Sequence, residues 1–281
     1  MVTKECYQQA VGVIKSCSVK GVLFASGGKK GYDALWARDS MISFLGASLV
    51  QDQVNKSTFR KTFKQSLIAL AKNQSRHGQM PNAVDTFSQR KPRVDYASID
   101  STLWYLIGYR LYQQRYGDKS LDRKYKTTLK KALDWLECQD VGEEGTPEQL
   151  PTTDWQDAFP HKYGRTISTQ ALYYKVLISL GKNSSARKLK NVVDADKDKK
   201  LWNGKFYAAY RWKNHGKYKE MGEWFDSLGN LLAIVFGLAD EKKAKKIISY
   251  LEKKKIHRPY PEKSIYPPIK KNSKDWQDYF L

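Results

Sequence analysis

Hydrophobic positions along the chain recur mostly at helical spacing, and the predicted helices come in pairs. Apolar residues at intervals of three and four are typical of one face of an amphipathic helix. This pattern predicts helices at residues 7–14, 41–50, 58–72, 101–116, 124–137, 168–180, 185–193, 224–238 and 244–254. Gly117 follows the fourth of these and is expected to end it. The sequence therefore predicts an all-α fold, built from stacked or ring-closed helical hairpins.

The segments between these helices carry other signals. Residues 73–94 and 138–165 are long polar loops, and the second contains three prolines. Residues 201–212 form an aromatic segment that is compatible with a β-hairpin, and the chain beyond Arg258 is rich in proline, which breaks helices. We expect a single domain over residues 1–281 with nine or ten helices.

The composition is that of a globular protein with a high positive charge. The chain has 50 Lys and Arg against 29 Asp and Glu, a formal net charge of +21. Its 8 Trp, 18 Tyr and 10 Phe offer more area for burial than a disordered chain carries. The three cysteines, Cys6, Cys17 and Cys138, have neither a CxxC pair nor a nearby histidine, which argues against structural zinc and for a reducing compartment. No signal-peptide pattern and no apolar run of about 18 residues occurs, so we expect a cytoplasmic protein without a membrane partner.

Most of the positive charge lies in predicted helices. Residues 119–131, 186–200 and 242–255 alternate lysines with apolar residues at helical spacing, which is typical of the solvated face of an amphipathic helix. A phosphate-binding surface for nucleic acid is the alternative, because clustered Lys and Arg bind phosphates by releasing counterions. The glycine-rich stretch at residues 24–32 lacks the spacing of a phosphate-binding loop and is interpreted as a connection.

Several carboxylates stand beside Trp or Tyr at predicted loop-to-helix junctions. They occur in the segments WARD (36–39), DYASIDSTLW (95–104), DWQD (154–157) and EWFD (223–226). An indole can stack on the apolar face of a sugar ring, carboxylates and Arg can hydrogen-bond its hydroxyls, and a carboxylic acid can protonate the glycosidic oxygen. This combination indicates a carbohydrate site that needs no metal or organic cofactor.

Each of these residues also has a purely structural interpretation. Asp39 and Asp100 could be N-caps or first-turn residues that favour a helix start. Asp154 and Asp157 could be turn residues before a helix. Trp104, at helical spacing, could be a core side chain rather than a sugar-stacking wall. If the hairpins close into a ring, the junctions fall on one face and the acids converge.

The motifs together resemble those of the six-hairpin glycosidases. Five segments carry the resemblance in the order of that superfamily: LWARDSMISFLGASL (35–49), GQMPNAVD (78–85), residues 94–118 with SIDSTLW, residues 154–177 with DWQDAF, and EWFDSLGNLLAIVFGLAD (223–240). The similarity is strongest to glycogen-debranching amylo-alpha-1,6-glucosidases, with neutral invertases as nearby relatives. It implies an (α/α)6 toroid and hydrolysis of an α-glucan or oligosaccharide by two carboxylates and water.

The resemblance also implies roles for individual residues. Asp157 matches the general acid that ends the Trp-x-Asp element, with Trp155 beside it. Trp36, Arg38 and Asp39 match the element that lines the terminal-sugar pocket, and Asp100 and Trp104 belong to the SIDxxLW element that faces the same pocket. The expected substrate-binding residues are therefore Trp36, Arg38, Asp39, Asp100, Trp104 and Trp155.

The sequence departs from the family pattern at two places. Many relatives have Glu where Ser168 stands, so one sugar contact is expected to be absent or made differently. The second catalytic carboxylate of the family follows a Tyr-Pro-Pro element such as residues 266–268, and here no acid matches it. Glu223, Asp226, Asp275 and Asp278 are the candidates that the sequence offers for the general base. The helix count predicts a toroid without its last hairpin or hairpins.

Three alternatives to a debranching-type hydrolase remain open from the sequence. One is a sucrose-cleaving enzyme of the neutral invertase type. Another is a carbohydrate-binding protein that keeps the pocket and lacks the base. The third is a basic helical protein that binds nucleic acid, for which salt-sensitive binding to duplexes of any sequence is expected.

Overall fold

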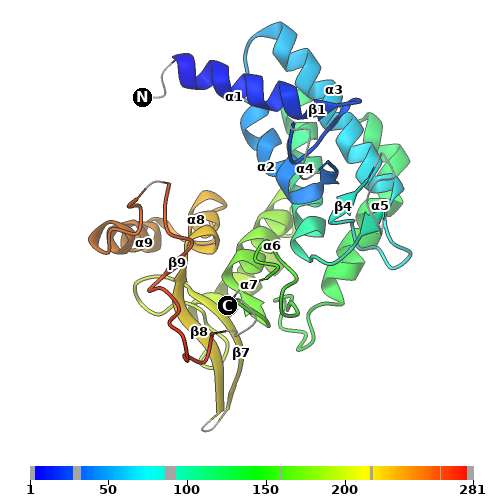
Figure 1. The fold of residues 1–281 in the computed structure, drawn as a ribbon. Helices are drawn as coiled ribbons and strands as arrows, with labels where there is room; N and C mark the ends of the chain where they lie inside the picture. The colour runs from blue at the N-terminus through cyan, green and yellow to red at the C-terminus, as the bar shows by residue number, and fades with distance from the viewer. Residues whose placement is uncertain are drawn as a thin grey trace. The chain divides into compact units, whose positions relative to one another are not determined.

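The computed structural model describes residues 4–27, 33–85, 93–158, 160–215, 218–259 and 261–276 of the 281-residue chain. It divides into two compact units, Met1–Leu136 and Glu137–Leu281, which are treated separately below. Figure 1 shows the elements in chain order from blue to red.

The first unit consists of helices joined by very short strands. Its helices are α1 (Lys4–Cys17), α2 (Ala37–Ala47), α3 (Gln53–Lys72), α4 (Asp100–Tyr116) and α5 (Ser120–Glu137). Its strands are β1 (Ser18–Val19), β2 (Val22–Leu23), β3 (Leu35–Trp36), β4 (Ala83–Val84) and β5 (Val94–Asp95). Strands β1 and β2 pair with each other, and the antiparallel sheet β3-β4-β5 joins residues that stand directly before α2 and shortly before α4.

The second unit combines four helices with a larger sheet. Its helices are α6 (Ile167–Ser179), α7 (Asn183–Ala195), α8 (Ser227–Val235) and α9 (Glu241–Lys253). Its strands are β6 (Arg165–Thr166), β7 (Ala208–His215), β8 (Tyr218–Asp226) and β9 (Ile265–Tyr266), which form one antiparallel sheet in the order β6-β7-β8-β9. Helix α6 follows β6 and α8 follows β8 without an intervening residue, so the sheet fixes where both helices begin (Figure 1).

The prediction of an all-α toroid is therefore wrong, because the described chain is mixed α and β with three antiparallel sheets. The predicted helices are all present, with shifted ends. The difference arises from strands of two residues, which are too short to show alternating hydrophobicity, and from the hairpin of β7 and β8. Residues 224–226 were predicted to begin a helix but lie in β8, and the predicted hairpin at 201–212 begins later and extends to Asp226.

The helix ends follow the chemistry of their sequences. Asp52, Thr166, Asp226 and Asp240 cap α3, α6, α8 and α9 by accepting hydrogen bonds from main-chain N–H groups in the first turn. Gly117 ends α4 in the left-handed conformation at φ +63°, as predicted.

Aromatic packing forms the core of the first unit. Phe44 of α2 stacks on Phe63 of α3 with ring centroids 4.1 Å apart, and Tyr112 of α4 meets Phe63 edge-on at 5.4 Å. Gly108 of α4 lies against Met41 of α2, and a Cβ atom at this position would stand 2.1 Å from the Met41 sulfur. A larger residue at position 108 would therefore force the Met41 side chain to move.

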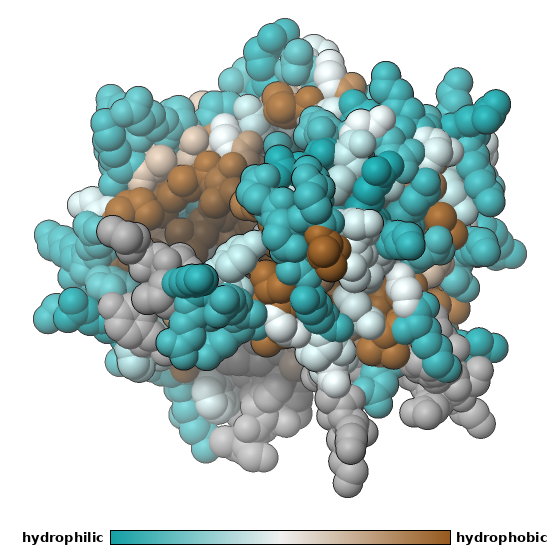
Figure 2. Space-filling view, turned by 90° about the horizontal axis from the view of Figure 1, so that it is seen from above, coloured by the Kyte–Doolittle hydropathy of each residue, from teal (hydrophilic) through white to brown (hydrophobic). Residues whose placement is uncertain are grey.

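The lysine-rich helices have the predicted amphipathic character. Helix α9 buries Ile247 and Leu251, while Lys242, Lys245 and Lys246 are exposed. Hydrophilic side chains cover most of the face seen in Figure 2, with hydrophobic patches between them. No helix in the described part of the chain is long and apolar enough to cross a membrane.

We predict that Gly108→Ala destabilises the protein by about 1–3 kcal/mol, because the added methyl group overpacks the contact between α4 and Met41 of α2. Gly12→Ala is the matched control: Gly12 lies inside α1 with no atom within 4 Å of its Cβ position, so the same change is expected to raise stability by about 0.5–1 kcal/mol. Denaturant unfolding measures the free energy of unfolding of both variants. Similar effects of the two substitutions would contradict the proposed overpacking.

Candidate functional site

In the first unit, the two predicted sugar-binding motifs are joined by an ion pair. Arg38 lies in the first turn of α2 and Asp100 is the first residue of α4. Arg38 Nη1 donates to both carboxylate oxygens of Asp100 at 3.0 and 2.8 Å, and Ser98 Oγ donates to the same carboxylate. The side chains are 14% and 4% exposed, so this pair is largely screened from water and is stronger than a surface ion pair.

Asn82, in the GQMPNAVD segment, connects the other motif residues of this unit. Its main-chain oxygen accepts from Ala37 N at 3.0 Å, and its side-chain amide donates to Asp95 at 3.0 Å. Ser101 Oγ, beside Asp100, donates to Asn82 Oδ1 at 3.1 Å. Three segments distant in sequence are thereby fixed around the starts of α2 and α4.

The remaining predicted residues of this unit differ in accessibility. Asp39 is partly exposed in the first turn of α2, and the N-cap position of that helix is Trp36. Trp36 is 7% exposed, and Trp104 is 1% exposed within the core. The burial of Trp104 fits the alternative of a core side chain.

In the second unit, the DWQD segment is held by a fully buried lysine. Lys162 Nζ lies 2.9 Å from Asp154 Oδ2 and 2.9 Å from Asp226 Oδ2, and none of the three side chains is more than 2% exposed. Burial by itself lowers the pKa of Lys162, but the attraction of the two carboxylates prevails and raises that pKa above its usual value. The lysine is therefore charged at neutral pH and links the DWQD loop to the N-cap of α8.

Further contacts fix the same loop. Asp154 accepts from Gln156 N at 2.9 Å and from Ser168 Oγ at 3.4 Å, so Ser168, where the resemblance leads one to expect Glu, serves to position Asp154. The Lys162 ammonium also lies over the Trp155 ring at 5.6 Å.

Asp157 has a different environment from Asp154. The structure places it at an exposed position of the loop, with Trp155 partly exposed two residues before it. Trp155 Nε1 and Gln156 Oε1 are buried and have no hydrogen-bond partner among the described residues. Two unsatisfied polar atoms next to an exposed carboxylate are typical of a surface that a polar ligand or water completes.

The acids considered for the general base have distinct positions. The Asp226 carboxylate accepts a hydrogen bond from Lys162 and caps α8. Glu223 is exposed, and Asp275 accepts from Tyr210 Oη at 3.2 Å. Asp278 lies outside the described residues.

Sequence reasoning missed Lys162 and did not assign a role to Asn82. Lys162 stands eight residues after Asp154 but 64 before Asp226, so no local pattern marks it as the partner of both acids. Its one sequence signal is a lysine placed between His and Tyr in a proline-containing loop. No group of three or more potential metal-ligating side chains occurs in the described ranges.

Comparisons with known proteins agree with the motif resemblance. Residues 9–141 match the family model of amylo-alpha-1,6-glucosidase. No curated protein matches the chain.

Solved structures of glycosidases share the fold at low sequence identity. A rhamnosidase from Klebsiella oxytoca with rhamnose bound is similar with a TM-score of 0.63 and 15% identity, over 93% of this chain and 49% of that one. A glycosidase variant in complex with glucose has a TM-score of 0.59 and 16% identity, over 89% of this chain and 69% of that one. A GH78 family rhamnosidase of Bacillus sp. GL1 has a TM-score of 0.62 and 13% identity, over 86% of this chain and 25% of that one.

The chain thus spans about half the length of the Klebsiella rhamnosidase that it matches. The resemblance to six-hairpin glycosidases is confirmed by the family match in the first half and by the fold along most of the chain. The matched family model and these three solved structures all belong to glycosidases.

We predict that Lys162→Met destabilises the protein by about 3–5 kcal/mol, because Asp154 and Asp226 would remain buried without a counter-ion. Lys182→Met is the matched control: Lys182 pairs with Glu137, and these side chains are 43% and 52% exposed, so a loss below about 1 kcal/mol is expected. Chemical denaturation near pH 7 gives the free energy of unfolding of both variants. Because the pKa of Lys162 is raised, its stabilising charge persists from neutral pH up to values above 10.5. Equal losses in the two variants would refute the role of the buried triad.

Proposed function

We propose that the protein is a glycoside hydrolase that acts on an α-glucan or oligosaccharide in the manner of amylo-alpha-1,6-glucosidases. The observation that carries the proposal is the buried pair of Arg38 and Asp100, which joins the WARD and SIDSTLW motifs within the segment that matches the amylo-alpha-1,6-glucosidase family. A guanidinium and carboxylates held beside indoles suit the hydroxyls and apolar face of a sugar ring.

In this proposal Arg38, Asp39 and Asp100 of the first unit hold the nonreducing terminal sugar, Trp36 contributes aromatic surface there, and Trp104 supports these residues from the core. In the second unit, Trp155 contributes aromatic surface beside Asp157. No step requires a metal or an organic cofactor, since acid and base catalysis by carboxylates is sufficient for hydrolysis of a glycosidic bond.

Asp157 is the proposed general acid. Its proton passes to the glycosidic oxygen as the bond from that oxygen to the anomeric carbon breaks. Water attacks the anomeric carbon, and a second carboxylate takes the proton that the water loses. The support for Asp157 is its match to the motif position, its exposure, and the rigid loop that Lys162 and Ser168 anchor through Asp154.

Two buried polar atoms beside Asp157, Trp155 Nε1 and Gln156 Oε1, suit binding of the same sugar. The N–H of Trp155 can donate to a sugar hydroxyl, and the amide oxygen of Gln156 can accept from one. Each bond would satisfy a buried group that has no partner in the described protein.

Asp157→Asn is expected to lower hydrolysis of a branched maltooligosaccharide by about 10²–10⁴-fold, because an amide cannot supply the proton. Binding of the same sugar, measured by calorimetry, should persist. Asp134→Asn, a change at a half-exposed side chain of α5, serves as the control and should leave the rate unchanged. Undiminished hydrolysis by Asp157→Asn would remove Asp157 from the role.

The same assay separates the rival functions. Faster cleavage of sucrose than of the maltooligosaccharide would favour an invertase-type enzyme. Sugar binding without any turnover at high protein concentration would favour a carbohydrate-binding protein. Tight binding of duplex DNA with a steep dependence on salt would favour the nucleic-acid alternative.

Trp155→Phe in the Asp157→Asn background is expected to weaken maltooligosaccharide binding by about 3- to 10-fold, the worth of one hydrogen bond. The melting temperature should hardly fall, because the lost N–H has no protein partner in the described structure. Trp224→Phe removes another buried N–H that lacks a partner among the described residues and is the matched control, with affinity expected to stay constant. Equal affinities in both variants would exclude a contact from Trp155 Nε1.

A further inference from the structure

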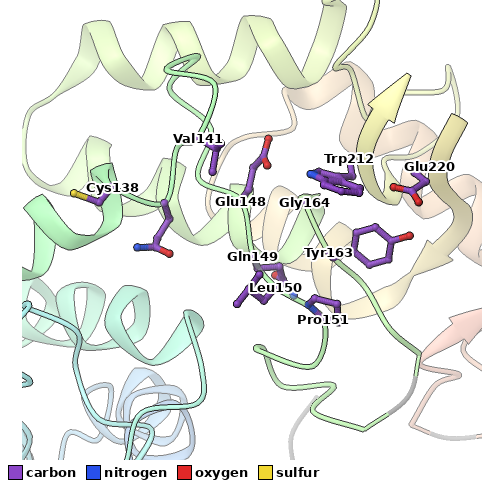
Figure 3. Close-up of a pocket in the computed structure, with 11 residues that line it drawn as sticks. Cys138, Val141, Glu148, Gln149, Leu150, Pro151, Tyr163, Gly164, Trp212 and Glu220 are labelled. Atoms are coloured by element: carbon purple, nitrogen blue, oxygen red, sulfur yellow. The ribbon is translucent and has the colours of Figure 1, made fainter. Parts of the chain in front are cut away.

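A separate cavity of about 510 Å³ lies within the second unit, lined by residues outside all the predicted site positions. Its wall includes Tyr163, Trp212 of β7 and Glu220 of β8, and its rim includes Leu150 and Pro151 (Figure 3). This volume falls in the range of small-molecule pockets, about 300–1,000 Å³.

The aromatic wall of the cavity is rigidly built. The Trp212 ring meets the Tyr163 ring edge-on at a centroid distance of 5.6 Å. Gly164, next to Tyr163, has φ +68°, and a Cβ atom there would lie 2.7 Å from Trp212 Cβ, so the close approach of these strands requires glycine. Main-chain hydrogen bonds in both directions between Gln149 and Gly164, at 2.9 and 2.8 Å, close the floor.

One arginine fixes the polar end of the same wall. Arg165 donates to the main-chain oxygen of Trp212 at 3.3 Å and pairs with Glu148 at 2.6 Å. Glu148 also accepts a hydrogen bond from the Trp212 side chain. Burial raises the pKa of Glu148, while Arg165 works in the opposite direction. The indole is thereby oriented before any ligand arrives.

The rim is unusually apolar for surface residues. Val141 is 80% exposed, Leu150 is 73% exposed and Trp212 is 37% exposed, and all three line this cavity. Large apolar side chains that gather in the open around one hollow mark a binding site more often than chance exposure does.

From this geometry we infer that the cavity binds a neutral carbohydrate ring, as a second sugar site apart from the Arg38–Asp100 and DWQD regions. The indole and the apolar rim fit the flat apolar face of a pyranose. The carboxylates of Glu148 and Glu220, on either side of the aromatic wall in Figure 3, fit its hydroxyl groups. Phosphorylated ligands are disfavoured by the negative charge of the same carboxylates.

The choice of an α-glucan as the ligand rests on the proposed function. A site of this kind would hold a stretch of the polymer away from the bond that is cleaved, which strengthens binding of long chains relative to short ones. The experiment therefore measures binding of a sugar in the cavity, independently of hydrolysis.

Cys138 provides the readout, because this exposed residue is among those that line the cavity, while the exposed Cys6 of α1 lies in the other unit. The full chain is alkylated with N-ethylmaleimide with and without maltohexaose, and each cysteine is followed by peptide mass spectrometry. Maltohexaose is expected to slow alkylation of Cys138 at least fivefold and to leave Cys6 unchanged.

Two substitutions test the cavity itself. Trp212→Ala is expected to lower maltohexaose affinity at least tenfold and to abolish protection of Cys138. Leu150→Arg should obstruct the rim with the same result and without disturbing the fold, since Leu150 is 73% exposed. Val235→Arg is the matched control, at a residue 71% exposed that does not line the cavity, and should bind as the parent chain does.

The outcomes separate this inference from the proposed function. Protection of Cys138 in a chain without hydrolytic activity would uphold the second site and refute the hydrolase. Hydrolysis of the branched maltooligosaccharide without protection of Cys138 by maltohexaose, or with Leu150→Arg binding maltohexaose as Val235→Arg does, would overturn the second site alone. Protection of Cys138 by tetramethylammonium but not by maltohexaose would overturn the carbohydrate assignment in favour of a cation.

Discussion

Lys162 is enclosed with two carboxylates in a place that water hardly reaches, and this arrangement constrains the loop and the helix around it. An ammonium group buried alone would lose its proton or unfold its surroundings, whereas Asp154 and Asp226 hold it in the charged form. In return, the lysine fixes two segments that are far apart in sequence. The DWQD loop keeps a defined shape because Asp154 cannot leave Lys162, and α8 begins where Asp226 caps it.

The sequence predicted the helices well because their information is local. Apolar spacing and terminal signals such as Gly117 identify α4 and α9 within a residue or a few of their ends. Strands such as β3 and β6 were missed because two residues cannot show a period, and pairing with distant segments creates them. The same limit explains why residues 224–226 are predicted as helix although they lie in β8. Their hydrophobic side chains continue the apolar pattern of α8, which follows them.

The candidate site was predictable to the level of motifs, and the partners within it were not. The WARD and SIDSTLW segments were singled out for sugar chemistry, yet the bond between Arg38 and Asp100 spans 62 residues and has no sequence signature of its own. Asn82 and Lys162 act through contacts of this long-range kind. Exposure could not be predicted from the motif either: Asp154 and Asp157 stand in the same DWQD segment, yet Asp154 is buried and Asp157 is exposed.

The lysine-covered faces of α7 and α9 have a consequence for how the protein meets a polymer. The neutral glucan of the proposed function has no charge for a field of this sign to attract, so encounters with it would depend on diffusion and on the number of accessible chain ends rather than on electrostatic steering. The same charge makes copies of the protein repel one another, which would keep them dispersed if many bound to one polymer.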